Sequence, residues 1–348
     1  MTFFRDNIDA MAAYVPGEQP AAGQRVIKLN TNENPYPPSP RAMAALATLD
    51  PEALRLYPDA MAGAFRQAVA DVLDTPAEWV LPGDGSDDVI MMIARSALGP
   101  GRRVAYPTPT FTFYRTQALI EGAEIREVPF APDFRLPIDD LAAADAHVTF
   151  IANPNSPSGT AAGNEELAAL AARLSGLLVI DEAYVDFAES SALPLVAEFP
   201  NVMLLRTLSK GYSLAGLRLG YGVAQPPLIQ GLLKTKGIYN VGAAPAAAGA
   251  AAMADQACKN ANAEKVKASR ARLAAALAEL GCPSLRSEAN FLLTTLPGGR
   301  AERAQQALKN RGILVRYYPM PPLRDCLRIT VGTDEQNDAV IAALKDWL

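Results

Sequence analysis

Histidine and cysteine are scarce in this 348-residue chain, and their scarcity argues against several kinds of active site. The single histidine, His147, leaves little scope for a Ser-His-Asp arrangement or for a metal site built from several imidazoles. The cysteines Cys258, Cys282 and Cys326 are odd in number and far apart, so they match neither a disulfide framework nor the spacing of metal ligands. The sequence therefore predicts no metal site.

Strong charge of one sign and long hydrophobic runs are also missing. The formal net charge is −5, with lysine and arginine scattered along the chain, which favours neither nucleic acid nor a membrane as a partner. The most apolar long stretch, residues 243–254, is mostly alanine and contains Pro245 and Gly249, so it is too short and too weakly apolar to span a bilayer. The N-terminus carries acid early and has no apolar signal core, and we expect a soluble, cytoplasmic protein.

From about residue 79 the chain alternates short apolar runs with helical patterns, which is typical of a parallel sheet covered by helices. The chain is also longer than one compact core needs, so we expect a large α/β domain and a smaller α+β domain. We place the large domain at 34–245 and the small domain at 1–33 together with 246–348, the N-terminal part forming an irregular arm. The expected strands of the large sheet are 79–81, 103–106, 124–128, 148–152, 177–180, 202–206 and 219–223. In the small domain we expect helices at 260–280 and 335–348 and strands at 290–296, 313–317 and 327–331.

Lys210 is the first candidate catalytic residue. It follows the apolar run 202–205 in a turn of small residues, and Arg218 comes eight positions later. A lysine at the mouth of a sheet forms an imine if burial or a neighbouring cation helps it to lose its proton. On its own, the stretch could be simply a strand, a turn and a surface lysine.

Other strand ends carry residues that could serve the same site, since ligands bind at the carboxyl ends of parallel strands. Asp181 ends an apolar run, where its carboxylate needs a positive partner or simply caps a turn. The loop 83–88 joins a strand to a helix and offers backbone N–H groups to an anion. Phe111 could supply a flat face for an aromatic ring or be an ordinary core residue, and Asn155 between two prolines could be only a turn residue.

An imine-forming lysine, a carboxylate for a pyridine nitrogen, an anion site and an aromatic plate are together what pyridoxal 5'-phosphate (PLP) requires. The chain resembles the fold-type-I, class I/II aminotransferases, and within them the histidinol-phosphate branch. The resemblance covers the chain nearly end to end, through the segments 14–17, 29–36, 56–59, 83–88, 181–184, 207–211, 215–218 and 327–332.

The resemblance implies a role for each matching residue. Lys210 carries the internal aldimine and moves the proton at the substrate Cα, Asp181 keeps the pyridine nitrogen protonated, and Tyr184 and Asn155 bond the phenolic oxygen. Phe111 stacks on the ring. The phosphate cradle consists of Gly85, Ser86, Asp87, Ser209, Arg218 and, from a second subunit of a homodimer, Tyr57. The residues implied for the substrate are Tyr14, Asn34, Arg316 for a phosphate and Arg328 for an α-carboxylate.

One position departs from the family pattern. The family has asparagine directly before Pro-Ser/Thr-Gly, whereas this chain has Ser156 there and Asn155 one place earlier. Either Asn155 reaches the cofactor oxygen through a shifted backbone, or Ser156 makes a weaker contact.

The resemblance implies ping-pong transfer between glutamate and imidazole-acetol phosphate, with an amino donor and a 2-oxo acid acceptor as the small-molecule partners. An aromatic amino-acid aminotransferase is the main alternative, because the same pocket accepts flat rings. A related phosphothreonine decarboxylase is a further alternative. A PLP-binding regulatory module without turnover would be a different class of protein, and such regulators usually carry a DNA-binding domain before this fold.

Overall fold

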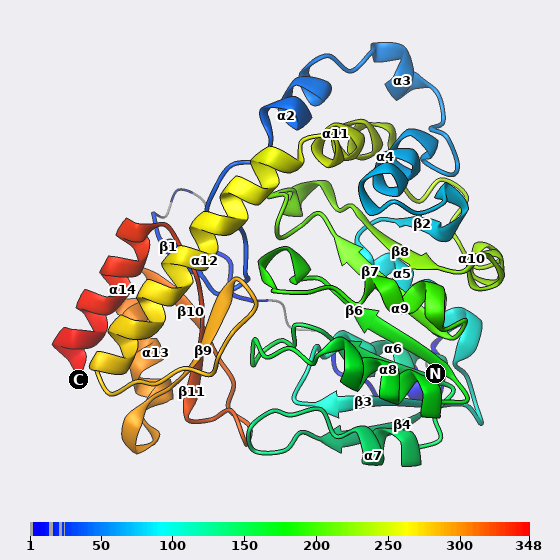
Figure 1. Cartoon of the computed structure of the whole chain (residues 1–348). Helices are drawn as coiled ribbons and strands as arrows, with labels where there is room; N and C mark the ends of the chain where they lie inside the picture. Colours follow the sequence, from blue (N-terminus) through cyan, green and yellow to red (C-terminus); the bar gives the residue numbers. More distant parts are fainter. Residues whose placement is uncertain (1–2, 14–16, 21–22, 24) are drawn as a thin grey trace.

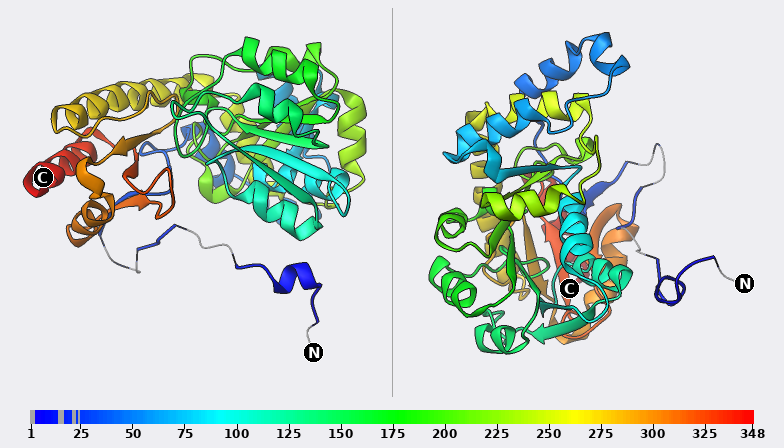
Figure 2. Two further views of the ribbon diagram at one scale, coloured as in Figure 1. Left: turned by 90° about the horizontal axis from the view of Figure 1, so that it is seen from below. Right: turned by 90° about the vertical axis from the view of Figure 1, so that its right-hand side faces the viewer.

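The fold is described from a computed structural model that covers residues 3–13, 17–20, 23 and 25–348. Two sheets lie side by side, and the long helix α12 (Gln256–Glu279) runs from the larger one to the smaller one (Figures 1 and 2). None of the helices in the described part of the chain combines the length and apolar character that a bilayer crossing needs.

The larger sheet has seven strands in the order β2-β8-β7-β6-β5-β3-β4. Only β8 runs in the direction opposite to the other strands, so those strands all end at one edge. The sheet strands are β2 (Val80–Gly83), β3 (Arg103–Thr108), β4 (Glu124–Pro129), β5 (Val148–Ala152), β6 (Leu177–Asp181), β7 (Val202–Thr207) and β8 (Gly220–Ala224).

Both faces of the central strands β5 to β8 are buried, which explains why these strands are nearly continuous apolar runs, whereas the edge strand β4 is largely exposed. In β6, Leu178 and Ile180 belong to one hydrophobic core and Val179 to the other, as the two-residue period of a strand requires. Helices α2 (Pro40–Ala47), α4 (Gly63–Leu73), α8 (Asn164–Arg173), α9 (Leu193–Glu198) and α11 (Ala243–Met253) contribute to the first core. Helices α5 (Ser86–Ala97), α6 (Phe113–Glu121) and α10 (Pro226–Leu233) contribute to the second.

The smaller sheet has the order β1-β10-β11-β9. Strands β10 (Ile313–Tyr317), β11 (Cys326–Thr330) and β9 (Phe291–Thr295) are antiparallel, and β1 (Ile27–Leu29) adds in parallel to β10. Helix α12 and the helices α13 (Ala301–Asn310) and α14 (Asp334–Trp347) complete a separate hydrophobic core with it. The other short α-helices of the described residues are α1 (Asp6–Asp9), α3 (Pro51–Arg55) and α7 (Ile138–Ala143).

The predicted fold class is confirmed: a mainly parallel seven-stranded sheet lies between helices, with a smaller α+β part beside it. Each predicted strand has a counterpart within a few residues. The expected irregular arm at residues 1–33 contains one short strand, because residues 27–29 pair with β10. Helix α11, which falls in the segment assigned to the small domain, packs on α2 and α4 and buries Ala248 and Met253 in the core of the large sheet.

Candidate active site

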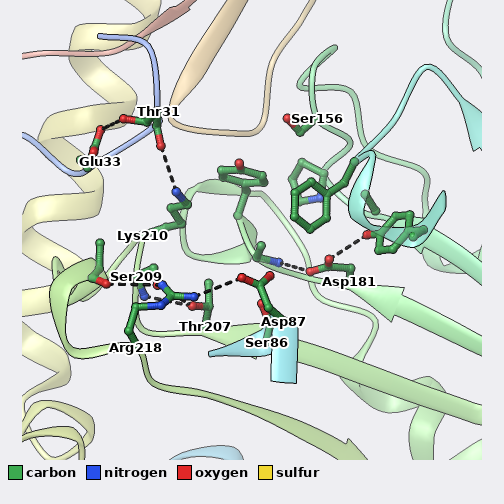
Figure 3. A pocket seen from close by; sticks show the side chains of 17 residues that line it. Thr31, Glu33, Ser86, Asp87, Ser156, Asp181, Thr207, Ser209, Lys210 and Arg218 are labelled. Carbon is green, nitrogen blue, oxygen red and sulfur yellow. Dashed lines mark hydrogen bonds and ion pairs between the residues drawn. The ribbon is translucent and has the colours of Figure 1, made fainter. Parts of the chain in front are cut away.

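A cavity of about 260 Å³ lies at the carboxyl ends of β5, β6 and β7, where it meets the segment that follows β1 (Figure 3). The topology explains its position, since parallel strands all deliver their last residues to this edge of the sheet. The residues that line it are Thr31, Glu33, Ser86, Asp87, Phe111, Tyr114, Ala152, Pro154, Ser156, Asp181, Ala183, Tyr184, Thr207, Ser209, Lys210, Ala215 and Arg218.

Lys210 projects into this cavity from the turn after β7. Its Nζ donates to the carbonyl oxygen of Thr31 at 3.2 Å (Figure 3). Burial lowers the pKa of Lys210 to about 8, while the nearby carboxylate of Glu33 works in the opposite direction. A substantial fraction of this amine is therefore neutral near physiological pH, as a nucleophile or proton acceptor must be.

Asp181, the last residue of β6, is only 4% exposed. Its Oδ2 accepts from the Tyr114 hydroxyl at 2.7 Å and its Oδ1 accepts from the Ala183 N–H at 3.1 Å. Burial raises the pKa of Asp181 to about 6. No cation forms an ion pair with this carboxylate in the part of the chain that the structure describes, so its environment suits a ligand that brings a positive charge.

The opposite side of the cavity is suited to an anion. Ser86 begins α5, whose first N–H groups and dipole favour negative charge. The Arg218 guanidinium donates to Ser209 Oγ at 3.4 Å and to Asp87 Oδ2 at 3.1 Å (Figure 3). Gly85 has φ +80°, a conformation that favours glycine, and a Cβ there would lie 2.7 Å from Arg218 Nη2 and would displace the guanidinium from the start of the helix.

Tyr184 and Ser156 lie on the cavity wall, whereas Asn155 does not. Asn155 is buried in its own turn, where its side chain bonds Thr110 Oγ1 at 2.7 Å and Ser158 Oγ at 2.9 Å. Ser156 faces the cavity, and its Oγ accepts from Arg328 Nη1 at 3.0 Å. The geometry thus brings Ser156, the residue that departs from the family pattern, to the site in place of Asn155.

Arg328 and Arg316 are direct cross-strand partners on β11 and β10. Both guanidinium groups lie over the ring of Tyr318, with Cζ 5.8 Å and 5.5 Å from its centroid. Arg328 is 9% exposed, donates to Asn30 O at 2.9 Å and leaves its Nε without a partner among the described residues. Like charges placed opposite each other are unfavourable, and a buried cation without an anion is costly, so this pair suits an anionic ligand.

The remaining predicted residues lie around the cavity or outside it. Phe111 is part of the wall, and Asn34 donates from its side chain to the carbonyl oxygen of Lys210 at 3.0 Å. Tyr57 is 82% exposed and stacks on Tyr239 at 4.6 Å, away from the cavity lining of its own chain. Tyr14 lies outside the described residues.

The residues present fit the cofactor that the sequence resemblance implies. The Asp181 carboxylate, which has no cationic partner among the described residues, suits the pyridinium nitrogen. Lys210, whose pKa is lowered, suits the aldehyde. The helix start with Arg218, Ser86 and Ser209 suits the phosphate.

Several lining residues were not predicted from the sequence. Tyr114 bonds Asp181, Thr207 Oγ1 lies 2.9 Å from Ser209 Oγ, and Thr31 and Glu33 face Lys210 from the N-terminal segment. Thr31 and Glu33 belong to the matching segment 29–36, which was the available signal for them. Nothing in the local sequence indicates that the Tyr114 hydroxyl would reach the end of another strand.

Comparison with known proteins agrees with this geometry. The chain matches the family described as Aminotransferase class I and II over residues 24–344. It is 54% identical over 346 residues to a protein named Histidinol-phosphate aminotransferase 1 from Trichormus variabilis, covering 99% of each chain. A protein of the same name from Nostoc sp. is 55% identical, covering 99% of this chain and 98% of that one. The crystal structure of histidinol-phosphate aminotransferase from Sinorhizobium meliloti in complex with pyridoxal-5'-phosphate superposes with a TM-score of 0.90 at 28% identity, covering 100% of this chain and 99% of that one. The chain belongs to the class I and II aminotransferases.

Proposed function

We propose that this chain is a PLP-dependent aminotransferase that interconverts histidinol phosphate and its 2-oxo counterpart, with glutamate and 2-oxoglutarate as the second pair. The single observation that carries the substrate assignment is the opposed pair Arg316 and Arg328. Glutamate brings an α-carboxylate and histidinol phosphate brings a phosphate. Two guanidinium groups that form no ion pair among the described residues would therefore serve both half-reactions. The name of the 54–55% identical relatives supports the same assignment.

Bound PLP supplies an electron-accepting ring that stabilises negative charge at the substrate Cα. The chain would position this ring between Phe111 and the residues at the end of β6. Asp181 would hold the proton on the pyridine nitrogen, and Tyr184 with Ser156 would contact the phenolic oxygen. The phosphate would be held by Arg218, Ser86, Asp87 and Ser209. Gly85 would leave room for the Arg218 guanidinium at the start of α5.

Lys210 would move the proton at the substrate Cα. Its Nζ can accept that proton because burial holds its pKa at about 8, well below that of an exposed lysine. Arg328 would hold the α-carboxylate of glutamate and Arg316 the phosphate of histidinol phosphate. Gly17 lies beside the Arg316 guanidinium, which supports a contribution to this end of the site from the arm that also contains Tyr14. Asn34 would fix the backbone of Lys210 from the same N-terminal side.

The proposal includes a homodimer in which Tyr57 reaches the phosphate of the neighbouring subunit. Support comes from an exposed apolar patch formed by Leu54, Leu56, Tyr57, Ile238 and Tyr239. An exposed apolar patch of this kind favours association. The family resemblance implies that a second copy of this chain covers the patch.

The test is a set of half-reactions of the purified holoenzyme, followed by the absorbance of its cofactor. We expect histidinol phosphate and glutamate to convert the cofactor fastest, and phenylalanine and tyrosine more slowly. A preference for phenylalanine over histidinol phosphate would replace this proposal with an aromatic amino-acid aminotransferase. Conversion by no amino donor at all would indicate a binding module.

A further inference from the structure

Asn32 occupies an unusual backbone position between the small sheet and the cavity. It is 1% exposed and has φ +59°, in the left-handed region that few residues other than glycine and asparagine adopt readily. Two residues of the small sheet region hold it there. Its N–H donates to Thr330 Oγ1 at 3.1 Å, its Oδ1 accepts from the same hydroxyl at 2.9 Å, and its carbonyl accepts from Asn290 Nδ2 at 2.9 Å.

The free end of the Asn32 amide is directed at Tyr184. Its Nδ2 donates to the Tyr184 hydroxyl oxygen at 2.9 Å. Because Thr330 donates to Oδ1, the orientation of the amide is fixed, and only its N–H side faces the tyrosine. The phenol oxygen therefore acts as an acceptor toward Asn32, and its own hydrogen is left for a partner on the cavity side.

The same bond changes the donor strength of Tyr184. Burial raises the pKa of Tyr184, whereas the positive charge of Arg328 and the hydrogen bonds of Asn32 and Ser156 to the phenol oxygen lower it, because each of them favours the phenolate. A phenol that is more acidic is a better hydrogen-bond donor. The Asn32 side chain does not itself line the cavity and reaches a bound molecule through Tyr184, while its chain neighbours Thr31 and Glu33 face the cavity directly.

We propose that Asn32 is a positioning residue that orients the Tyr184 hydroxyl as a donor into the cavity and ties it to β11, the strand that carries Arg328. The inference rests on the proposed role of Tyr184 toward the phenolic oxygen of PLP. Thr330 lies two positions after Arg328 on β11, so the group that anchors Asn32 and the group proposed for the substrate carboxylate share one rigid element. The position of β11 therefore determines both where Arg328 lies and how Asn32 orients the Tyr184 hydroxyl.

The test is a pH titration of the visible absorbance of the PLP-loaded enzyme. Asn32→Gly removes the amide and tolerates the left-handed backbone. A hydrogen bond donated by Tyr184 stabilises the anionic form of the phenolic oxygen of PLP. If Tyr184 becomes a weaker donor, the midpoint of the cofactor titration should therefore move to higher pH. The expected shift is about 0.5–1 pH unit upward, the size of one net hydrogen bond. A midpoint that stays at the wild-type value would overturn the inference.

Asn262→Ala is the matched control. Asn262 is also a buried asparagine, and its Nδ2 donates to Pro37 O at 3.1 Å, so it steadies the same N-terminal segment without contacting Tyr184. We expect it to lower thermal stability and to leave the midpoint unchanged. If this control shifts the midpoint equally, the shift reflects a less ordered N-terminal segment and not the Asn32–Tyr184 hydrogen bond, and the inference is overturned. Should Asn32→Gly fail to fold, Thr330→Val tests the anchor: an upward shift supports the inference and none refutes it.

A double substitution separates this inference from the proposed function. Tyr184→Phe alone should raise the midpoint, and adding Asn32→Gly should then produce no further shift, because the group through which Asn32 acts is gone. If Tyr184→Phe shifts the midpoint and Asn32→Gly does not, only the role of Asn32 fails. If Tyr184→Phe has no effect, the proposed role of Tyr184 fails and this inference fails with it.

Discussion

Removal of the Arg316 guanidinium should change which amino donor the enzyme prefers. Arg316 lies opposite Arg328 in the register of β10 and β11, and it has no carboxylate partner among the described residues. The phosphate of histidinol phosphate is the proposed anion for this position. Phenylalanine has no phosphate and would depend on Arg328 alone.

The size of the effect follows from the burial of the two arginines. A charge-assisted hydrogen bond contributes about 1.5–3 kcal/mol, or roughly ten- to a hundredfold in kcat/KM. Arg316 is half-buried, so solvent weakens its interaction and we expect a loss nearer tenfold for histidinol phosphate. Arg328 is buried, so Arg328→Ala should lower kcat/KM by nearer a hundredfold. This loss should apply to glutamate and to every other donor with an α-carboxylate.

The assay is kcat/KM for histidinol phosphate, glutamate and phenylalanine, measured on wild type, Arg316→Ala and Arg328→Ala. Arg303→Ala provides the control, since Arg303 is exposed on α13 and lies outside the site. We expect Arg316→Ala to reduce the value for histidinol phosphate and to leave phenylalanine nearly unchanged. An equal loss on all donors would refute the assignment of Arg316 to the phosphate.

Three further predictions concern the lysine, the aspartate and the subunit contact. In the apoenzyme, the rate of PLP capture should rise with pH with a midpoint near 8, because Lys210 reacts when its amine is neutral. Glu33→Gln should move this midpoint to lower pH, since the Glu33 carboxylate raises the pKa of Lys210. A midpoint that moves upward would contradict this electrostatic role. The folded apoprotein holds Asp181 with a pKa of about 6, above its unfolded value, so its stability should fall as the pH rises from about 4 to 6. Asp181→Asn should remove on the order of 2–3 kcal/mol of that pH dependence in thermal melts, and an unchanged pH profile would argue against a buried ionisable carboxyl. Tyr57→Ala and Lys210→Ala subunits, each inactive alone, should regain activity when exchanged into mixed dimers, which contain one intact site, whereas no recovery after verified exchange would exclude a shared site.

The sequence was most informative where strand direction alone determines position. Lys210, Asp181 and Ser86 come together because each lies at or just after the end of a strand, and these strands all end at the same edge of the sheet. The strands themselves are visible in the sequence as apolar runs. Strand β1 was missed because three residues give no periodic pattern, and its pairing with β10 depends on a contact far along the chain.

Side-chain direction within loops could not be predicted in the same way. Asn155 turns into its own loop because Thr110 and Ser158 satisfy its amide, and these partners are set by the folded turn rather than by any spacing in the sequence. Ser156 then faces the cavity and meets Arg328, a residue far away in the chain. The bonds of Tyr114 to Asp181 and of Asn32 to Tyr184 are likewise long-range contacts that no local pattern encodes.

The most direct test of the central claim is to find the lysine that binds the cofactor. The PLP-loaded protein would be reduced with borohydride, digested and mapped by mass spectrometry. The account predicts a pyridoxyl group on the peptide that contains Lys210, and none in Lys210→Ala, which should still fold with a similar melting temperature. A pyridoxyl group on any other lysine, or none in the wild type, would contradict the assignment of this cavity as the catalytic centre.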